Sequence, residues 1–376
     1  MNIPLSSPYI GKEEIKAVTD VLKTPNLSMG PKIDEFEKKI SEYIGTKYAV
    51  GVNSGTSGLH ILIRALGIKD NDEVITTPFS FIASSNCMLY ERAKPVFVDI
   101  DEKTLNIDPG LINEAITKKT KAILLVHAFG QPCDMKQIME IAEDHNLKVI
   151  EDACEAIGSE YLGKKVGTFG DAAVFAFYPN KQITTGEGGM IVSNDEKIYK
   201  LARSLRNQGR SENMGWLDHK ILGYNYRLDE MSAALGVVQL KKIEKIIEMR
   251  NNVAQEYNKR LKDVEGVEIP CVDEKTTKMS WFVYVIHINK KNIQRENRKI
   301  RDKIVHEITN KGIGSKPYFT PIHLQPFYRE MGFREGDFPI TELAGNTGLA
   351  LPFFTDMKIE QIEYVCDNLK DLMDKI

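Results

Sequence analysis

Residues 175–190 read Phe-Ala-Phe-Tyr-Pro-Asn-Lys-Gln-Ile-Thr-Thr-Gly-Glu-Gly-Gly-Met. They contain one lysine, Lys181, and the other motifs of the chain are interpreted as support for it. The apolar run 172–177 predicts a buried strand, and Met190 begins the next apolar run. Lys181 therefore lies between two strands, after a proline and before a glycine-rich turn. Rigid backbone on both sides would present its amine to a buried electrophile, which makes it a candidate Schiff-base lysine. A surface lysine in a hairpin is the simpler alternative, and the neighbouring motifs decide between the two.

A second motif, Asn-Ser-Gly-Thr-Ser-Gly at residues 53–58, joins a short apolar strand at 48–52 to a helical pattern. Small residues at such a junction expose backbone N–H groups at a helix N-terminus, where the partial positive charge suits a phosphate. Ser54, Gly55 and Thr56 are the candidate phosphate ligands. The same residues also make an ordinary helix cap, so this turn alone does not establish a phosphate site.

Strands and helices alternate through the first half of the chain. Apolar runs predict strands at 73–76, 96–99, 122–126 and 148–151, and helical patterns lie between them at 86–90 and 135–145. This alternation predicts an α/β fold, with a mostly parallel sheet covered by helices on both faces. Ligands of such sheets bind at the carboxyl ends of the strands, where we expect Ser54, His127 and Asp152.

The last third of the chain has a different pattern. A long helical pattern from 231 to 261 leads to an alternating strand at 281–288 and a charged helix at 295–311. The length of 376 residues favours two domains. We expect a large domain at 1–240 and a smaller α+β domain at 241–376 that includes the connecting helix.

Composition excludes several classes of protein. The net charge of -3 and the pI near 6.2 show no basic footprint for nucleic acid or for membrane lipid. The five cysteines are scattered without a Cys-x-x-Cys pair, so neither a disulfide framework nor a metal site is expected. The sequence shows no apolar signal segment and no membrane span, and we expect a cytoplasmic protein.

Three features together predict the cofactor. The turn at Ser54, Gly55 and Thr56 suits a phosphate, Lys181 supplies an amine, and Asp152 follows a predicted strand as a free acid. Pyridoxal 5'-phosphate needs these three groups, because its aldehyde takes an amine and its ring nitrogen needs a carboxylate to stay protonated. The sequence therefore predicts a pyridoxal phosphate site.

Six ordered motifs carry a resemblance to a known family. They are NSGTS (53–57), PFSF (78–81), VHAFGQPCDM (126–135), EDACEA (151–156), VGTFGD (166–171) and KQITTGEGG (181–189). Together they resemble the DegT/StrS family of sugar aminotransferases from about residue 5 to residue 355. The resemblance implies the fold-type-I architecture of pyridoxal-phosphate-dependent transferases and a homodimer with shared active sites.

The resemblance also implies roles for single residues. Lys181 would bond to the cofactor and shuttle protons, and Asp152 would pair with the ring nitrogen. Gly55 and Thr56 would hold the phosphate, with Ser54 beside them, and Phe81 would stack on the ring. Asn225 resembles an asparagine that reaches the phosphate in the neighbouring subunit.

Several residues depart from the family pattern or leave alternatives open. Many members have Ser where Ala176 stands, His where Ile157 stands, and Gln where Glu155 would meet the ring oxygen, which Glu155 could do only when protonated. His323 lies in a loop that in the family lines the sugar pocket, and Arg227 is either a diphosphate ligand or an ion-pair partner. His127 and His323 are also possible general bases, but a structural histidine is the more frequent case.

The expected reaction moves an amino group from an amino acid to a keto group of a nucleotide-linked deoxysugar. L-glutamate is the expected donor. One alternative is a sugar dehydratase that uses the same cofactor, although in those members the lysine position resembles histidine. The other is a sensor or regulatory protein that binds the cofactor without turnover, against which the intact Lys181 and Asp152 argue. The sugar, the nucleotide and the ring carbon are not specified by the sequence.

Overall fold

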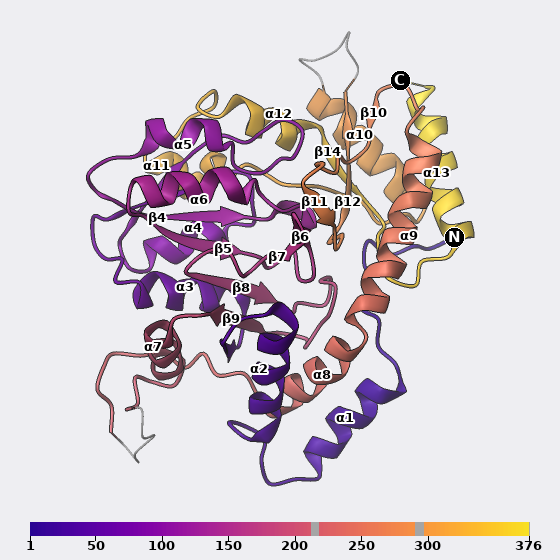
Figure 1. The fold of residues 1–376 in the computed structure, drawn as a ribbon. Helices are drawn as coiled ribbons and strands as arrows, with labels where there is room; N and C mark the ends of the chain where they lie inside the picture. The colour runs from indigo at the N-terminus through magenta and orange to yellow at the C-terminus, as the bar shows by residue number, and fades with distance from the viewer. Residues whose placement is uncertain (212–217, 290–296, 376) are drawn as a thin grey trace.

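A seven-stranded sheet forms the centre of the larger part of the protein (Figure 1). The computed structural model describes residues 1–211, 218–289 and 297–375. The strand order is β1-β9-β8-β5-β4-β2-β3. The strands are β1 (Tyr48–Val52), β2 (Glu73–Thr76), β3 (Lys94–Phe97), β4 (Thr120–Val126), β5 (Lys148–Asp152), β8 (Ala172–Ala176) and β9 (Gly189–Ser193). Only β9 runs antiparallel to its neighbours β1 and β8, so the predicted mostly parallel sheet is confirmed.

Helices cover both faces of this sheet because its strands are apolar on both sides. Along β4, Leu124 packs in one core with α3 (Gly55–Ala65), α4 (Ala83–Leu89) and α7 (Glu196–Arg206). Leu125 points to the other face and packs with α5 (Pro109–Ala115) and α6 (Met135–Asp144). The same face is continued by α2 (Pro31–Ile44) and α8 (Glu230–Lys241). The result is a three-layer α/β/α arrangement.

A second, antiparallel sheet organises the C-terminal part, in the order β10-β12-β14-β13. These strands are β10 (Val267–Glu268), β12 (Tyr284–Ile288), β13 (Lys316–Pro317) and β14 (Gly348–Leu351). Its helices are α9 (Ile243–Leu261), α10 (Asn297–Asn310), α11 (Pro326–Glu330), α12 (Pro339–Thr347) and α13 (Ile359–Met373), with a short 3-10 turn, η3 (Ile322–Leu324). The expected start of the charged helix at residues 295 and 296 lies outside the described residues.

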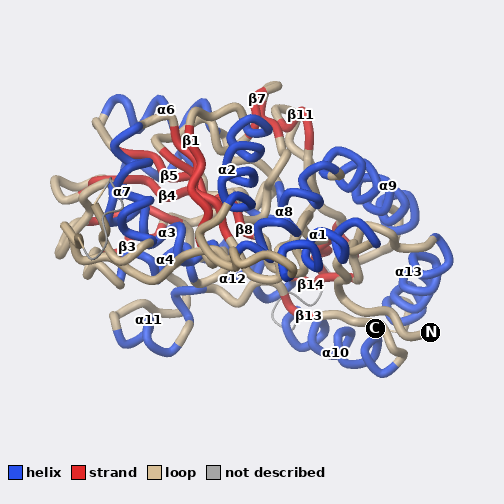
Figure 2. The backbone as a smooth tube through the Cα atoms, turned by 90° about the horizontal axis from the view of Figure 1, so that it is seen from below, coloured by secondary structure: helices blue, strands red, loops and turns tan. Residues whose placement is uncertain are grey.

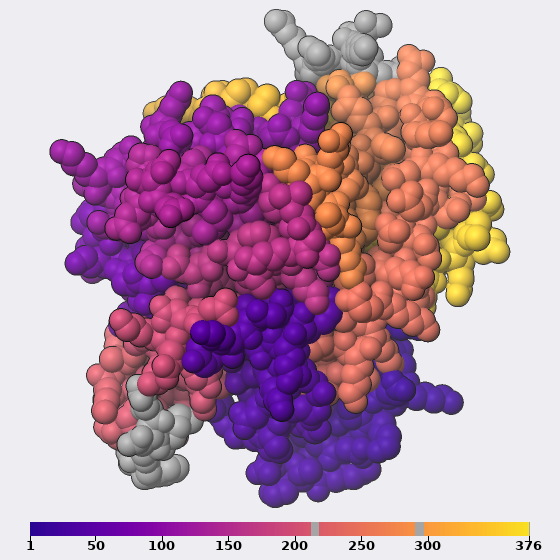
Figure 3. Space-filling model, in the orientation of Figure 1, coloured from indigo at the N-terminus to yellow at the C-terminus, as the bar shows by residue number. Residues whose placement is uncertain are grey.

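The two parts are joined in several places (Figures 2 and 3). β11 (Thr276–Lys278) pairs with β6 (Glu160–Tyr161), which in turn pairs with β7 (Lys164–Lys165). The expected long helix is two helices, because α8 ends and α9 begins at Lys242, and α1 (Lys12–Leu22) packs against α8. Figure 3 shows the C-terminal residues, orange to yellow, adjoining the magenta surface of the larger part.

The first residues of the chain pack in the C-terminal core rather than under the large sheet. Ile3 is fully buried there, and its backbone N–H donates to the carbonyl of Gly312 over 2.8 Å. The chain therefore passes from the second part into the first before β1. The division at residues 240 and 241 stays a prediction. Among the described residues, no helix is both long enough and apolar enough to span a bilayer.

Candidate active site

A cavity of about 480 Å³ lies at the carboxyl ends of the central strands. Its walls include seven of the residues expected from the sequence: Ser54, Gly55, Thr56, Phe81, Asp152, Glu155 and Lys181. These residues come from four separate segments of the chain, which the parallel sheet brings to one edge. The structure thus places the predicted phosphate turn, acid and lysine around one space.

Lys181 lies in the connection between β8 and β9, as predicted. These two strands are antiparallel neighbours, so their connection stays at the end of the sheet. The Lys181 side chain is 12% exposed, and its Nζ lies 3.4 Å from Oε1 of Glu155. Its Nζ also lies 3.8 Å from the centre of the Phe282 ring. The amine is therefore held at the cavity wall.

The N-terminus of α3 forms the wall expected to take a phosphate. Ser54 is the cap residue, and its hydroxyl accepts a hydrogen bond from the Ser57 N–H over 3.1 Å. Helix geometry leaves the N–H groups of Gly55 and Thr56 without partners inside the helix. A Cβ atom on Gly55 would lie 2.8 Å from Cys154 Sγ and 2.9 Å from Ala176 Cβ, so only glycine allows this close approach. The turn is a cradle of backbone donors on an 11-residue helix.

Ala176, where the family resemblance implies serine, lines the same cavity. Its methyl group packs near Gly55 and brings no donor to the cavity. The backbone N–H groups at the start of α3 are hydrogen-bond donors in this wall. Ile157 is the other apolar residue that departs from the family pattern. It is buried in the core beneath the sheet and does not line the cavity.

Asp152 ends β5 and is held as an acceptor. Its Oδ2 accepts a hydrogen bond from the Ser84 hydroxyl over 2.7 Å, and its Oδ1 accepts one from the Cys154 N–H over 3.2 Å. Ser84 in turn lies 2.7 Å from the Ser80 hydroxyl. A fixed carboxylate of this kind suits a protonated ring nitrogen. Sequence patterns do not mark Ser84, because its contact with Asp152 joins α4 to β5.

Glu155 is buried beside the lysine. Its Oε2 accepts a hydrogen bond from the Phe129 N–H over 3.0 Å, and its Oε1 faces Lys181. Burial raises the pKa of Glu155, although the positive charge of Lys181 opposes this. A raised pKa favours the protonated form, which is the form that can donate to a phenolate oxygen.

Phe81 is 62% exposed although its ring lines the cavity. A large exposed ring at the wall of a cavity is available to stack on a planar ligand. Other residues that line the cavity were not predicted from the sequence, among them Tyr178, Phe282, Tyr318 and Phe319. The last three belong to the C-terminal part, and periodicity alone does not tell which of its residues face the first part.

Three expected site residues do not line this cavity. Asn225 is exposed on a segment that bridges to Asn207, and the Arg227 guanidinium donates to the Asn207 amide oxygen over 3.1 Å. His323 is fully buried, with Nε2 3.0 Å from Oε1 of Glu342. Substrate contact by His323 stays a prediction and would require this side chain to leave its present position.

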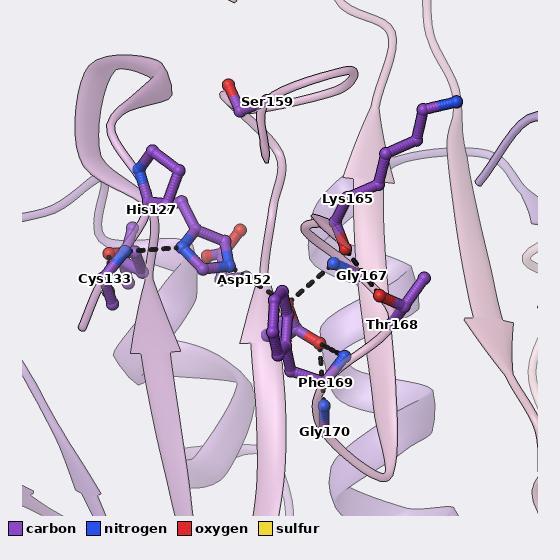
Figure 4. A network of polar contacts seen from close by, with 12 residues as sticks. His127, Cys133, Asp152, Ser159, Lys165, Gly167, Thr168, Phe169 and Gly170 are labelled. Atoms are coloured by element: carbon purple, nitrogen blue, oxygen red, sulfur yellow. Dashed lines mark hydrogen bonds and ion pairs between the residues drawn. The ribbon is translucent and has the colours of Figure 1, made fainter. Parts of the chain in front are cut away.

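His127 belongs to a buried polar network behind the cavity (Figure 4). Its Nδ1 accepts a hydrogen bond from the Cys133 N–H over 3.0 Å, so its proton lies on Nε2, which donates to Glu151 over 3.1 Å. The Glu151 carboxylate also accepts from the N–H groups of Gly167, Phe169 and Gly170. Both ring nitrogens of His127 are thus occupied, and this geometry favours the structural interpretation over a general base.

Comparisons with known proteins identify the family of the chain. Residues 8–370 match the model of the DegT/DnrJ/EryC1/StrS aminotransferase family. GDP-perosamine synthase of Escherichia coli O157:H7 is 37% identical over 370 residues, which span 98% of each chain. PseC of Helicobacter pylori, an aminotransferase of pseudoaminic acid biosynthesis, superimposes with a TM-score of 0.93 at 30% identity over all of both chains. The pyridoxal phosphate form of a putative sugar aminotransferase, Spr1654 of Streptococcus pneumoniae, gives 0.94 at 26% identity, covering 100% of this chain and 99% of that one.

Proposed function

The chain belongs to the DegT/DnrJ/EryC1/StrS aminotransferase family, and from this premise we propose that it moves the amino group of L-glutamate to a keto group of a GDP-linked deoxysugar. It is a pyridoxal-phosphate-dependent sugar aminotransferase, as the sequence predicted. The name of the relative GDP-perosamine synthase supports guanosine diphosphate as the nucleotide. The amino donor and the exact sugar are the finer parts of the proposal.

One observation carries the proposal: Lys181, Asp152 and the turn at Ser54–Thr56 surround one cavity. Each offers the group that one part of the cofactor needs, namely an amine, a carboxylate and backbone N–H donors. When bound, pyridoxal phosphate supplies an aldehyde that takes up the amino group and a protonated ring that withdraws electrons. The residues therefore fit the cofactor.

The roles of the side chains follow from this fit. Lys181 would carry the proton to and from the substrate carbon, because its amine lies at the cavity wall. Asp152 would keep the ring nitrogen protonated, and Ser84 fixes the Asp152 carboxylate by a hydrogen bond. Glu155 would meet the ring oxygen, to which only its protonated form can donate, and Phe81 would cover the ring.

The proposal includes a homodimer. Asn225 is exposed and outside the cavity of its own chain, which is consistent with a role in the phosphate site of a second subunit. Two-fold symmetry would then complete two sites at once. Arg227, which donates a hydrogen bond to Asn207, would lie beside the same interface between the two subunits.

The alternatives are not favoured. A dehydratase would have another residue in place of Lys181, and a regulator without turnover would not need a lysine and an acid at one cavity. The presence of both side chains supports an enzyme with a complete transamination cycle.

The test replaces Lys181 by alanine and measures two things in the cofactor-loaded protein. We expect the absorbance of the wild type to change when glutamate is added, and amino-sugar product to form from a GDP-linked keto-deoxysugar. Lys181→Ala should bind cofactor but lose multiple turnover by at least about a thousand-fold. Lys197→Ala, an exposed lysine on α7, is the matched control. Sustained turnover by Lys181→Ala would refute the assignment, and turnover only with a UDP-linked sugar would refute the nucleotide.

A further inference from the structure

The amino group of Lys181 has an aromatic neighbour that belongs to the C-terminal part of the protein. Its Nζ lies 3.8 Å from the centre of the Phe282 ring and 3.4 Å from the Glu155 carboxylate. Phe282 is 1% exposed, and it also lines the cavity. The face of an aromatic ring carries negative partial charge and attracts an ammonium group, most strongly where water is excluded.

A buried arginine fixes the backbone of Phe282. Arg250, on α9, is 2% exposed. Its Nε donates to the carbonyl of Trp281 over 2.7 Å, and its Nη2 donates to the carbonyl of Phe282 over 2.6 Å. The Phe282 N–H donates to the carbonyl of Phe129 over 3.1 Å, and Phe129 is also the residue that holds Glu155. The ring and the carboxylate beside Lys181 thus share one anchor.

A second set of bonds ties the same segment to the lysine loop. The side-chain amide of Gln182, next to Lys181, donates to the Ser280 hydroxyl over 2.8 Å and to the carbonyl of Glu155 over 2.7 Å. Ser280 also donates its N–H to the Ser159 hydroxyl. Residues 280–282 are therefore locked against the loop that carries the lysine, and Phe282 cannot move without disturbing these bonds.

We propose that Phe282 is a positioning residue, whose ring holds the amino group of Lys181 whenever that group is not bonded to the cofactor. A free lysine side chain has four rotatable bonds and would otherwise lose its place at the cavity wall. The ring and Glu155 keep the amine near its point of action between the two halves of the reaction. The proposal rests on the proposed function only in taking Lys181 as the acting lysine.

Other titratable or charged groups also lie near Lys181. Asp152, Glu155, Cys154 and Tyr318 line the same cavity, and Arg250 lies behind Phe282. Replacement of Phe282 leaves all five in the chain. A change in the proton affinity of Lys181 on such a replacement therefore reports the contact with the ring.

The experiment measures how fast an amine reagent, acetic anhydride, labels Lys181 in the full-length chain without cofactor, as a function of pH. Peptide mass spectrometry quantifies the label at this one residue. In Phe282→Leu the midpoint of labelling should move to lower pH by about 0.7, a roughly five-fold weaker hold on the proton, as expected for loss of a partly desolvated cation–π contact. Phe282→Tyr keeps the ring and should match the wild type.

The midpoint separates the proposal from a merely structural role. A looser cavity raises the labelling rate at every pH but leaves the midpoint in place, and that outcome for Phe282→Leu would overturn the proposal. If Phe282→Leu does not fold, a trifluorinated phenylalanine at position 282 keeps the shape and weakens the negative ring face. An unchanged midpoint in that variant would also overturn it. Labelling does not require transamination, so this result stays distinguishable from failure of the proposed function.

Discussion

Replacement of Glu151 by glutamine tests the buried network behind the cavity. Glu151 is fully buried at the end of β5, next to Asp152. Its Oε1 accepts from the N–H groups of Phe169 and Gly170, each over 2.8 Å. Its Oε2 accepts from the Gly167 N–H over 2.7 Å and from His127 Nε2 over 3.1 Å. All four partners are donors, so only a group with two acceptor oxygens satisfies them.

Glutamine keeps the shape of Glu151 but has one acceptor oxygen. Its NH2 group must face two of the four donors, and a buried donor without a partner costs about 1–3 kcal/mol. His127 cannot relieve the conflict by moving its proton, because its Nδ1 already accepts from the Cys133 N–H. Glu151→Gln should therefore lose about 4 kcal/mol, the middle of the range for two unpaired donors. At an unfolding entropy of about 2 cal/mol/K per residue, this lowers the thermal midpoint of the 376-residue chain by roughly 5 °C.

Scanning calorimetry of the full-length chain, at equal cofactor and protein concentration, gives the midpoints. The matched control is Glu143→Gln, an exposed glutamate on α6, whose midpoint should stay within about 1 °C of the wild type. If Glu151→Gln also stays within that range, the four hydrogen bonds do not stabilise the fold in the way argued.

The same variant has a defined dependence on pH. Burial alone would raise the pKa of Glu151, but the hydrogen bonds from His127 and the backbone lower it overall. A folded-state pKa below the unfolded value of about 4.3 gives stability that is present above that value and is lost as the pH falls through the folded pKa. The difference in stability between wild type and Glu151→Gln should be constant from about pH 6 to 8 and shrink below about pH 4. A difference that grows on acidification would contradict this sign.

Two further predictions concern the cavity and the dimer. Gly55→Ala forces a Cβ against Cys154 and Ala176, so affinity for pyridoxal phosphate, measured by equilibrium dialysis, should fall at least about ten-fold; an unchanged affinity would exclude a tight phosphate turn. Lys181→Ala and Asn225→Ala, each inactive alone, should recover about one quarter of wild-type activity when co-refolded in equal amounts, because half of the dimers are mixed and one site of each mixed dimer is intact. No recovery would show that Asn225 acts within its own subunit.

Much of the fold was predictable because its strands are buried on both faces. The apolar runs at β4 and β5 are unbroken, as is typical of strands buried on both faces. The ends of these strands mark where the site residues lie. The break at Lys242 was not predictable, because one helical pattern continues through both α8 and α9. The placement of Ile3 in the C-terminal core was missed for a similar reason, since its contacts are with residues beyond position 250.

The candidate site also contains residues that were predictable from the sequence and residues that were not. The shared location of Lys181, Asp152 and the turn at Ser54 was predictable because each stands beside a recognisable strand or helix end, and parallel strands carry such ends to one edge. Ser84 and Phe282 were missed because their contacts join distant elements. A hydroxyl or a ring in the sequence does not tell which carboxylate or amine it will meet.

The cavity also shows why the first part of the chain is not the whole site. Lys181 and Asp152 come from the large sheet, whereas Phe282, Tyr318 and Phe319 come from the C-terminal part and line the same space. The groups proposed for proton transfer and for the cofactor thus lie in one part, and the other part adds aromatic surface to the same cavity. Electrostatic interactions strengthen where water is excluded, so contacts such as that of Lys181 with Glu155 depend on how closely the C-terminal part packs against the lysine loop. Residues 280–282, bonded to both parts, connect that packing to the lysine loop.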